Sequence, residues 1–473
     1  MRFNSLQYFA FLPVVFLVFY FIADKYRYLV LLLASICFYA ALRVSYLLVV
    51  LPLVVTVTYY IGIRMGCCEA VERKKWFLWV GIGVNLFVLG SMKYLPVGRT
   101  FVSIGVSFYV FQAISYLIDV YMEIEKPELH FGYFALYLGF FPKLLQGPIE
   151  RAGDLLPQLK ANYSFNYDNM RSGMLLFTWG LFKKVVVADR ISGFVNVVYD
   201  NVSAYSGLQL ITATYMYAFQ LYFDFSAYTD MALGTAILFN IKLTQNFNSP
   251  YLATSVIDFW RRWHISFSRW ILDYIFAPLQ MQWRNWKQWG TVSALIVTFL
   301  ISGIWHGVGW GFIIWGLLHG FYMACSVFYR PFQSRIYQYL RLENSIIGRA
   351  WRIAVTFNLI CFAWIFFRAT NINDALLILK KMFSLPSYNA QMTIYQFLRV
   401  NLGGLGIAKV DMVILILVFI IISMVSFYNL HVNGFSRILN ASLIRRWSFY
   451  IVLVIIVITL GTINDIPYLY FQF

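Results

Sequence analysis

Two histidines stand in sequence patterns that could support proton-transfer chemistry. His306 lies in SGIWHG, residues 302–307, in the middle of residues 291–329, which contain no Lys, Arg, Asp or Glu. His264 precedes it by 42 residues (306 − 264), in DFWRRWHISFSRW, residues 258–270. A neutral imidazole, with a pKa of about 6.5, can take a proton from an attacking group near neutral pH. Because an ionisable group at membrane depth is costly and often functional, we interpret His306 as a candidate general base.

The surroundings of His306 favour that chemistry without proving it. Burial in an apolar run disfavours the charged imidazolium and so keeps the base available. Gly303 and Gly307 flank the histidine closely enough to let backbone and substrate approach it. The simpler interpretation, a histidine that is only hydrogen-bonded inside a helix hairpin, stays open on the sequence pattern alone.

Residues 258–270 have the spacing of an amphipathic helix. On a helix, one face carries the aromatic side chains Trp260, Trp263, Phe267 and Trp270. The opposite face carries Arg262, Ser266 and Arg269. Such a pattern is typical of a helix at the level of the lipid headgroups, with His264 as one polar residue of an anchor. The functional interpretation is that Arg261, Arg262 and His264 line a polar entrance.

The amino-acid composition indicates that membrane helices position these residues. Of 473 residues, 61% are hydrophobic and 12% charged, whereas about a quarter charged is typical of soluble domains. The apolar runs able to enter a bilayer are residues 8–22, 28–42, 46–63, 76–92, 101–121, 131–145, 208–223, 291–305, 310–329, 353–367, 412–427 and 449–460, with weaker candidates at 174–187 and 231–241. We therefore expect an all-α polytopic membrane protein with roughly eleven to fourteen membrane-entering helices. No internal repeat is evident, so a single domain over residues 1–473 is the simplest account.

The net charge of +17 indicates topology, not binding to nucleic acid, because the basic residues fall in short loops between apolar runs. If the amino terminus is outside, the first and third loops face the cytosol with six basic residues, Lys25, Arg27, Arg64, Arg73, Lys74 and Lys75. Only Arg43 lies in the loop between them. Since cytosolic loops are enriched in Lys and Arg, this orientation is favoured.

Charged residues inside or beside apolar runs need partners. Asp224 and Asp230 are six residues apart, about 120° around a helix, which argues against a shared metal. Pairing with basic or backbone donors is the default for such carboxylates, and lining a polar tunnel is the functional alternative. Lys183 and Lys184 lie at the end of an apolar run, where we favour contact with lipid headgroups over contact with an anionic substrate.

No bound metal or cofactor is expected. The five cysteines show no zinc-ligand spacing, and the chain has no Gly-x-x-x-x-Gly-Lys phosphate loop.

The two histidine segments together resemble the signature of the membrane-bound O-acyltransferases, in particular the bacterial branch that includes the alginate O-acetylation membrane protein and its peptidoglycan- and cellulose-acetylating relatives. Similar blocks run through most of the chain. They are residues 105–121, 141–149, 180–189, 222–230, 245–251, 363–368 and 468–473.

This resemblance implies a fold of membrane helices around a central catalytic tunnel and an O-acyltransferase activity. It implies His306 as the catalytic histidine and His264 as a second catalytic or orienting residue. From the residues themselves we add Arg261, Arg262, Trp305, Asp224 and Asp230 as candidate substrate contacts. The expected donor is a cytosolic thioester, acetyl-CoA or an acyl carrier protein. The expected acceptor is an extracytoplasmic polysaccharide, reached through a separate extracytoplasmic acetyltransferase partner, and the expected location is the bacterial inner membrane.

Other classes of membrane protein are less consistent with the residues. A transporter or lipid-linked-sugar flippase would be equally polytopic and basic, but would not require the paired Trp-His segments. A membrane glycosyltransferase should carry acidic residues in an early outer loop, and the loop around Arg43 has none. Within the acyltransferases, a long-chain protein acyltransferase stays the nearest alternative.

The predicted topology can be tested by cysteine accessibility. In a background without native cysteines, Glu72→Cys should resist an impermeant thiol reagent in intact cells and react after permeabilisation, because its loop is cytosolic. Arg43→Cys, in the predicted outer loop, is the matched control that should react in intact cells. Labelling of Glu72→Cys in intact cells would reverse the assignment.

Overall fold

The computed structural model describes residues 1–42, 44, 46–94, 105–343, 345–384, 434–462 and 467–469. Every regular element in these ranges is helical, which confirms the expected all-α polytopic class. The apolar run 412–427 and Arg43 lie outside the described residues.

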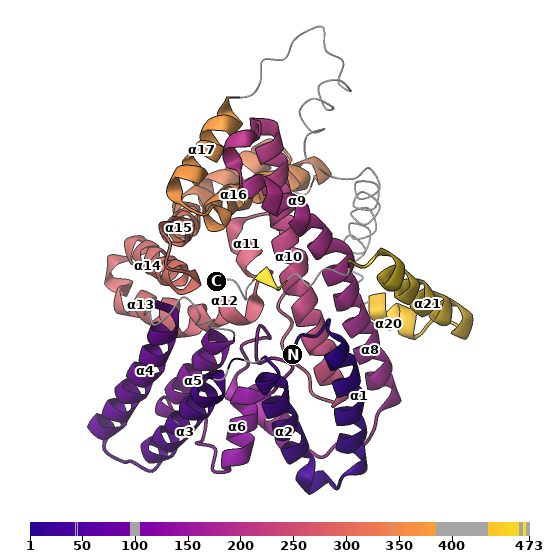
Figure 1. Cartoon of the computed structure of the whole chain (residues 1–473). Coiled ribbons are helices and arrows are strands. Elements are labelled where there is room, and N and C mark those ends of the chain that lie inside the picture. Colours follow the sequence, from indigo (N-terminus) through magenta and orange to yellow (C-terminus); the bar gives the residue numbers. More distant parts are fainter. Residues whose placement is uncertain are drawn as a thin grey trace.

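The amino-terminal helices stand side by side in the lower half of the molecule (Figure 1). They are α1 (Leu6–Phe21), α2 (Arg27–Ala40), α3 (Leu47–Gly66), α4 (Val71–Tyr94), α5 (Val106–Tyr121) and α6 (Phe131–Gly139), with the short η1 (Asp24–Tyr26) between α1 and α2. The α1–α2 and α3–α4 connections lie at the same end of this group (Figure 1). These are the two basic loops that the sequence places together on the cytosolic side.

A second group of helices is built around the 32-residue α10 (Gly207–Leu238). It includes α7 (Ala152–Lys160), α8 (Tyr167–Phe182), the π-helix η2 (Lys183–Ala188), α9 (Asp189–Tyr199) and η3 (Val202–Ala204). α8 and α10 approach closely through facing glycines: a Cβ on Gly173 would come within 2.7 Å of the Gly234 carbonyl oxygen, and a Cβ on Gly234 within 2.6 Å of the Gly173 carbonyl oxygen. Small residues at helix contacts of this kind are common in membrane proteins.

The remaining elements follow α10 along the chain. They are η4 (Pro250–Leu252), α11 (Val256–Trp260), α12 (Ile265–Ile271), η5 (Leu272–Phe276), α13 (Ala277–Gln282), η6 (Arg284–Trp286), α14 (Gln288–His306), α15 (Trp310–Tyr339), α16 (Ile346–Arg368), α17 (Ile372–Phe383), α20 (Gly434–Leu439) and α21 (Leu443–Leu460). α20 and α21 lie at the edge of the molecule beside α8 (Figure 1).

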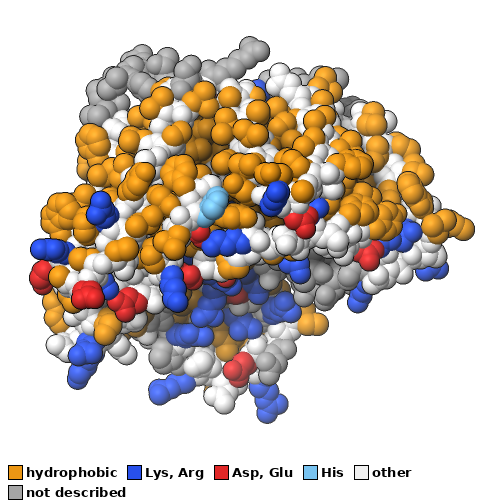
Figure 2. Space-filling model, turned by 90° about the horizontal axis from the view of Figure 1, so that it is seen from below, with side chains coloured by type: hydrophobic (Ala, Val, Ile, Leu, Met, Phe, Trp, Pro, Cys, Tyr) orange, Lys and Arg blue, Asp and Glu red, His pale blue; other side chains and the backbone are white. Residues whose placement is uncertain are grey.

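The helices have the length and surface of membrane spans. Within the described residues, α3, α4, α14, α15, α16 and α21 are long and apolar enough to cross a bilayer, and α1 and α5 are shorter apolar helices. Large hydrophobic side chains are exposed along them, such as Val49, Phe87 and Ile458, as expected of surfaces that face lipid. Seen from below, hydrophobic side chains cover much of the molecule while Lys and Arg gather toward one side (Figure 2).

A stretch without helix runs through the interior. Residues 140–150 are all buried, and side chains of other elements bond to two of their backbone groups: Phe141 N–H donates to Ser35 Oγ at 3.0 Å, and Ile149 N–H donates to Ser266 Oγ at 3.0 Å. Irregular backbone is tolerated at membrane depth only where protein or a cavity surrounds it. This loop therefore belongs to the core.

Lys183 and Lys184 form buried ion pairs, so the expected contact with lipid headgroups is wrong. Lys183 Nζ lies 2.7 Å from Asp230 Oδ2, and Lys184 Nζ lies 2.7 Å from Asp224 Oδ1 and 2.8 Å from Asp189 Oδ1. The π-helix η2 presents the two consecutive lysines to carboxylates six residues apart on α10. Asp224 and Asp230 are therefore paired with basic side chains, as expected by default, and the partners are lysines.

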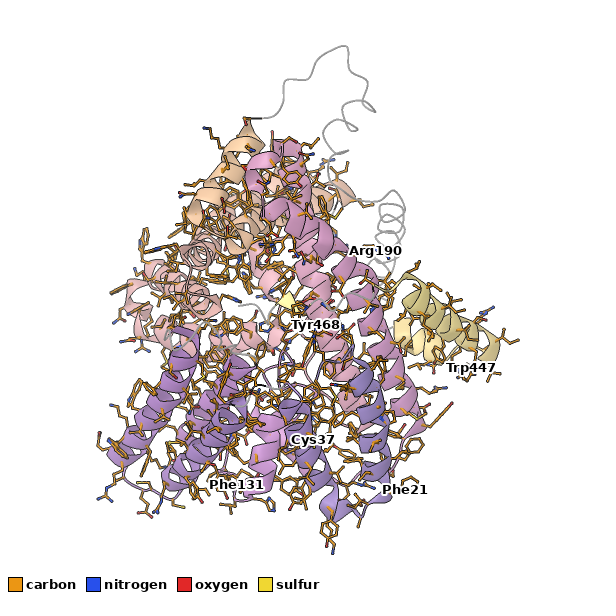
Figure 3. All side chains as sticks on the ribbon, viewed as in Figure 1. Phe21, Cys37, Phe131, Arg190, Trp447 and Tyr468 are labelled. Carbon is orange, nitrogen blue, oxygen red and sulfur yellow. The ribbon has the colours of Figure 1, made fainter. Side chains whose placement is uncertain are left out.

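The carboxy-terminal segment completes this cluster. Leu469 N–H donates to Asp224 Oδ2 at 2.8 Å, and Lys184 Nζ lies 4.3 Å from the ring centroid of Tyr468. Tyr468 lies at the centre of the molecule (Figure 3). Thr462 N–H, further back, donates to the Val185 carbonyl oxygen at 2.9 Å, within the π-helix. The last described residues are therefore part of the core.

The buried lysine cluster predicts a large difference between two lysine substitutions. Lys184→Met leaves two buried carboxylates without their cation and should lower the free energy of unfolding by about 3–5 kcal/mol. Lys74→Met removes an exposed pair with Glu123 and should leave the melting temperature in detergent unchanged. Equal melting temperatures for the two variants would contradict a stabilising role of the cluster.

Candidate active site

His306 is the last residue of α14, where the helix leaves its final carbonyl groups without helical partners. The end of α4 supplies those partners. Lys93 Nζ donates to the carbonyl oxygens of Trp305 and His306, the latter at 3.0 Å, and Tyr94 OH donates to the carbonyl oxygen of Ile304. A cation at a helix carboxyl terminus also stabilises the helix dipole. α4 thus fixes the backbone that presents His306.

Aromatic rings enclose the His306 side chain, which is 5% exposed. Its ring centroid lies 4.4 Å from that of Trp305, 4.8 Å from Trp315, 5.2 Å from Phe367 and 6.2 Å from Phe267. A surrounding of low polarity strengthens electrostatic interactions at the reacting atoms and limits access of water. This environment suits a neutral imidazole acting as a base.

The glycines beside His306 are required by packing. A Cβ on Gly303 would come within 2.5 Å of the Phe312 carbonyl oxygen, and a Cβ on Gly307 within 2.2 Å of the Phe312 ring. α14 and α15 can therefore meet tightly at the point where the chain turns behind His306.

Residues 258–270 do not form one helix, so the expected headgroup anchor is wrong. α11 ends at Trp260, α12 begins at Ile265, and His264 between them has φ 44° and ψ 55°, in the left-handed region. The four aromatic side chains of the segment, Trp260, Trp263, Phe267 and Trp270, are all buried. The aromatic face packs into the protein core and leaves His264 at a break between two short helices.

Phe267 connects the two histidines. The His264 ring centroid lies 5.1 Å from that of Phe267, which lies 6.2 Å from His306 and 4.4 Å from Trp305. His264 is 2% exposed, and its Nε2 has no hydrogen-bond partner among the described residues. The fold therefore brings His264 and His306 into one enclosed site.

A third histidine lies behind the same aromatic wall. Trp260 Nε1 donates to His319 Nδ1 at 3.1 Å, and the Trp315 ring lies between His319, at 4.9 Å, and His306, at 4.8 Å between centroids. His319, on α15, thus accepts a hydrogen bond from the neighbouring helix α11. Because Nδ1 accepts this bond, the neutral ring carries its proton on Nε2.

The predicted arginines separate in space. Arg261 lines a cavity of about 560 Å³ between the α11–α12 segment and helices α14 and α15, together with Arg269. Arg262 is not part of that lining, and its Nε donates to Asp258 Oδ1 at 2.8 Å. Trp260 and Phe299 form the cavity wall nearest His319 and Trp315. Of Arg261, Arg262 and His264, which were expected to line a polar entrance, only Arg261 lines this cavity.

The predicted aspartates lie in the lysine cluster. The described contacts of the Asp224 and Asp230 carboxylates lead to Lys183, Lys184 and Leu469, and none leads to either histidine. Phe225, next to Asp224, does pack on His264 at 4.8 Å between ring centroids. A role of these aspartates in substrate binding stays a prediction.

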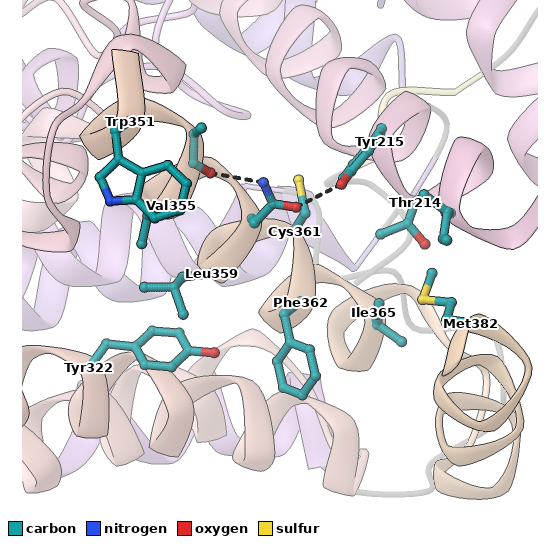
Figure 4. A pocket seen from close by; sticks show the side chains of 13 residues that line it. Thr214, Tyr215, Tyr322, Trp351, Val355, Leu359, Cys361, Phe362, Ile365 and Met382 are labelled. Carbon is teal, nitrogen blue, oxygen red and sulfur yellow. Dashed lines mark hydrogen bonds between the residues drawn. The ribbon is translucent and has the colours of Figure 1, made fainter. Parts of the chain in front are cut away.

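A second cavity, of about 630 Å³, lies between α10, α15, α16 and α17 (Figure 4). Its lining is largely apolar, apart from the hydrogen bond from Tyr215 OH to Asn358 Oδ1 at 2.6 Å. Trp351, Val355 and Leu359 on its rim are exposed on α16. These features are those of a recess in the lipid-facing surface.

Sequence reasoning missed two residues that shape the site. Lys93 was absent from the candidates, although a lysine at the end of an apolar run is the available signal. Asn246 lies in the family-like block 245–251, but its hydrogen bonds to the residues after His264 were not predicted, because those partners lie 19 and 20 residues away (265 − 246 and 266 − 246).

The sequence profile of the membrane-bound O-acyltransferase family matches residues 105–368, more than half of the chain and including both histidines. The protein belongs to this family. It is 38% identical over 424 residues to the peptidoglycan O-acetyltransferase of Helicobacter pylori, covering 80% of this chain and 78% of that protein. It is 33% identical over 442 residues to the probable alginate O-acetylase AlgI of Pseudomonas aeruginosa, covering 89% and 81%.

A more distant relative is the teichoic acid D-alanyltransferase of Bacillus subtilis, 28% identical over 272 residues, covering 56% of this chain and 68% of that protein. The family and the apolar helices together define a multi-pass acyltransferase of the bacterial inner membrane.

The two histidines should differ in their effect on catalysis. If His306 is the base, His306→Ala should lower the transfer rate by about 10²–10⁴-fold while expression and melting temperature hold. His264→Ala should lower activity through orientation of the reactants. His130→Ala, at an exposed histidine, is the control and should leave the rate unchanged. Transfer at the wild-type rate by purified His306→Ala protein would defeat the assignment.

Proposed function

We propose that this protein takes an acetyl group from a cytosolic thioester and passes it toward hydroxyl groups of an extracytoplasmic polysaccharide, with a separate extracytoplasmic acetyltransferase as its partner. The observation that carries the proposal is His306 at the end of α14, enclosed by aromatic rings and joined to His264 through Phe267.

The chemistry requires one base and no external energy source. The acceptor hydroxyl oxygen attacks the thioester carbonyl carbon while His306 takes the hydroxyl proton. The carbon–sulfur bond then breaks, and the leaving thiolate recovers the proton from the imidazolium. Because a thioester is already activated, the protein needs to supply a path, a base and protection from water.

The contact of His306 with the carboxyl end of α4 supports transfer toward the outside. Lys93, which binds the His306 carbonyl oxygen, is 21 residues from Glu72 in the predicted cytosolic loop (93 − 72). At 1.5 Å per helical residue this separation is about 32 Å, close to the roughly 30 Å thickness of the hydrocarbon core. In the predicted topology the reacting group is therefore delivered near the outer face.

The 560 Å³ cavity supports entry of an anionic carrier. Exposed Arg261 and Arg269 line it together with apolar side chains, a combination suited to a ligand with an anionic head and a narrow arm. Electrostatic attraction of this kind assists arrival and weakens as salt screens it.

The acceptor class follows from the relatives. The names of two relatives state peptidoglycan and alginate as the polymers that are acetylated, both extracytoplasmic polysaccharides. The immediate acceptor in our proposal is a hydroxyl of the polymer or a Ser hydroxyl of the partner. A long-chain protein acyltransferase is the competing activity that the donor experiment excludes or supports.

Donor use can be tested in liposomes that hold the protein with its cytosolic face outward. Labelled acetyl-CoA, or an acetylated acyl carrier protein, is added outside, and the polysaccharide with the cognate partner is enclosed. Label should appear on the enclosed acceptor. Efficient transfer from a long-chain donor with none from either acetyl donor would overturn the proposal.

The same assay tests the entrance. Arg261→Gln combined with Arg269→Gln should raise KM for the donor with little change in kcat, because the arginines act on arrival of the carrier. Arg262→Gln, outside the cavity lining, is the matched comparison. A raised KM in Arg262→Gln alone would place the entrance elsewhere.

A further inference from the structure

Residues 246–248 run alongside residues 262–266 and bond to them on both sides of His264. Asn248 N–H donates to the Arg262 carbonyl oxygen at 3.0 Å, before the histidine. After it, Ile265 N–H donates to the Asn246 carbonyl oxygen and Ser266 N–H donates to Asn246 Oδ1, both at 3.0 Å. We call these three hydrogen bonds the His264 clamp.

The clamp holds a conformation that the local sequence does not favour. His264 has φ 44°, a left-handed conformation that is uncommon for residues other than glycine. Its own side chain does not cap α12, although the first N–H groups of a helix need acceptors. Asn246 Oδ1 provides an acceptor from 20 residues away, so the imidazole is not used as a cap.

The hydrogen bonds fix which way the Asn246 amide faces. A backbone N–H can only donate, so the oxygen of the amide must face Ser266 and the nitrogen must point away from it. Asn246 is 1% exposed, and its Nδ2 has no hydrogen-bond partner among the described residues. A buried donor without a partner is costly. We therefore ascribe the role of Asn246 to its Oδ1, which accepts the Ser266 N–H.

The segment 246–248 also contacts the His264 ring, through Phe225. Phe247, next to Asn246, packs on Phe225 at 5.1 Å between ring centroids, and Phe225 packs on His264 at 4.8 Å. Ser266, whose N–H is bound by Asn246, accepts the Ile149 N–H of the buried loop through its Oγ. Backbone, side chain and loop therefore converge on the two residues that follow His264.

We propose that Asn246 is a positioning residue that sets the orientation of His264 and, through it, the rate of acyl transfer. This inference rests on the proposed function for its kinetic part and on the clamp alone for its structural part. Asn246 acts through His264, so its loss should matter only while His264 is present.

The first experiment measures the clamp directly. Asn246→Leu keeps nearly the same side-chain size but removes the acceptor of Ser266 N–H. Hydrogen exchange over residues 262–270 is measured in purified full-length protein and resolved to single amides. Exchange of the Ser266 amide should become at least tenfold faster. Asn162→Leu, at an exposed asparagine, is the matched control and should exchange as the wild type does. Unchanged exchange in Asn246→Leu would refute the clamp, whatever reaction the protein catalyses.

The second experiment is a double-mutant cycle in the liposome assay. Asn246→Leu should lower kcat at least tenfold with less than a twofold change in KM and an unchanged melting temperature. In the His264→Ala background the same substitution should change kcat less than twofold. Equal losses of kcat in both backgrounds would show that Asn246 acts independently of His264 and would overturn the inference. An unaltered kcat in Asn246→Leu protein whose hydrogen exchange shows an open clamp would also overturn it.

Measurements on the wild-type protein distinguish a failure of the positioning role from a failure of the proposed function. If the wild type transfers no acetyl group from either donor, the proposed function fails, and the cycle is run with the long-chain donor that the same assay identifies. If no donor supports transfer, the positioning role fails with the proposed function, and the exchange result still decides whether the clamp exists.

Discussion

The whole structure depends on the need to satisfy backbone groups without water. A helix meets this need internally, and every place where the helix stops must find donors and acceptors in the protein. The three main breaks found here are the buried loop 140–150, the bend at His264 and the end of α14 at His306. Each is closed by side chains from distant segments: Ser35 and Ser266, Asn246, and Lys93 with Tyr94.

These closures meet around the candidate active site. Ser266 bonds to the buried loop through Oγ and to Asn246 through its N–H, one residue beyond the start of α12. Lys93 secures the opposite side by holding the end of α14. Both candidate histidines thus lie where regular helix is interrupted, and side chains from several elements bond the backbone at these interruptions.

The class of fold could be predicted from the sequence because hydrophobicity over about 20 residues is a local property. His306 and His264 were proposed as catalytic candidates from residue types and from family resemblance, and the fold brings both against Phe267. Other expectations failed for identifiable reasons. The 3–4–3 aromatic spacing at residues 258–270 suits one amphipathic helix, but it could not reveal that Asn246 would stabilise a left-handed residue in its middle. Lys183 and Lys184 were interpreted from their place at the end of a run, whereas their partners on α10, Asp230 and Asp224, lie 47 and 40 residues further along the chain (230 − 183 and 224 − 184). Contacts of this range have no signature in periodicity.

The hydrogen bond from Leu469 to Asp224 spans 245 residues, and it has a consequence for biosynthesis. Chains are synthesised at about 5–20 residues per second, so roughly 10–50 s pass between synthesis of α10 and arrival of its last partner. During this interval α10 is already in the membrane with one carboxylate oxygen of Asp224 unmatched. Lys184, made 40 residues before Asp224, is in place from the start and keeps that carboxylate neutralised until the final strand of chain arrives. The order of residues along the chain thus provides Asp224 with a cationic partner before the carboxy-terminal segment is made.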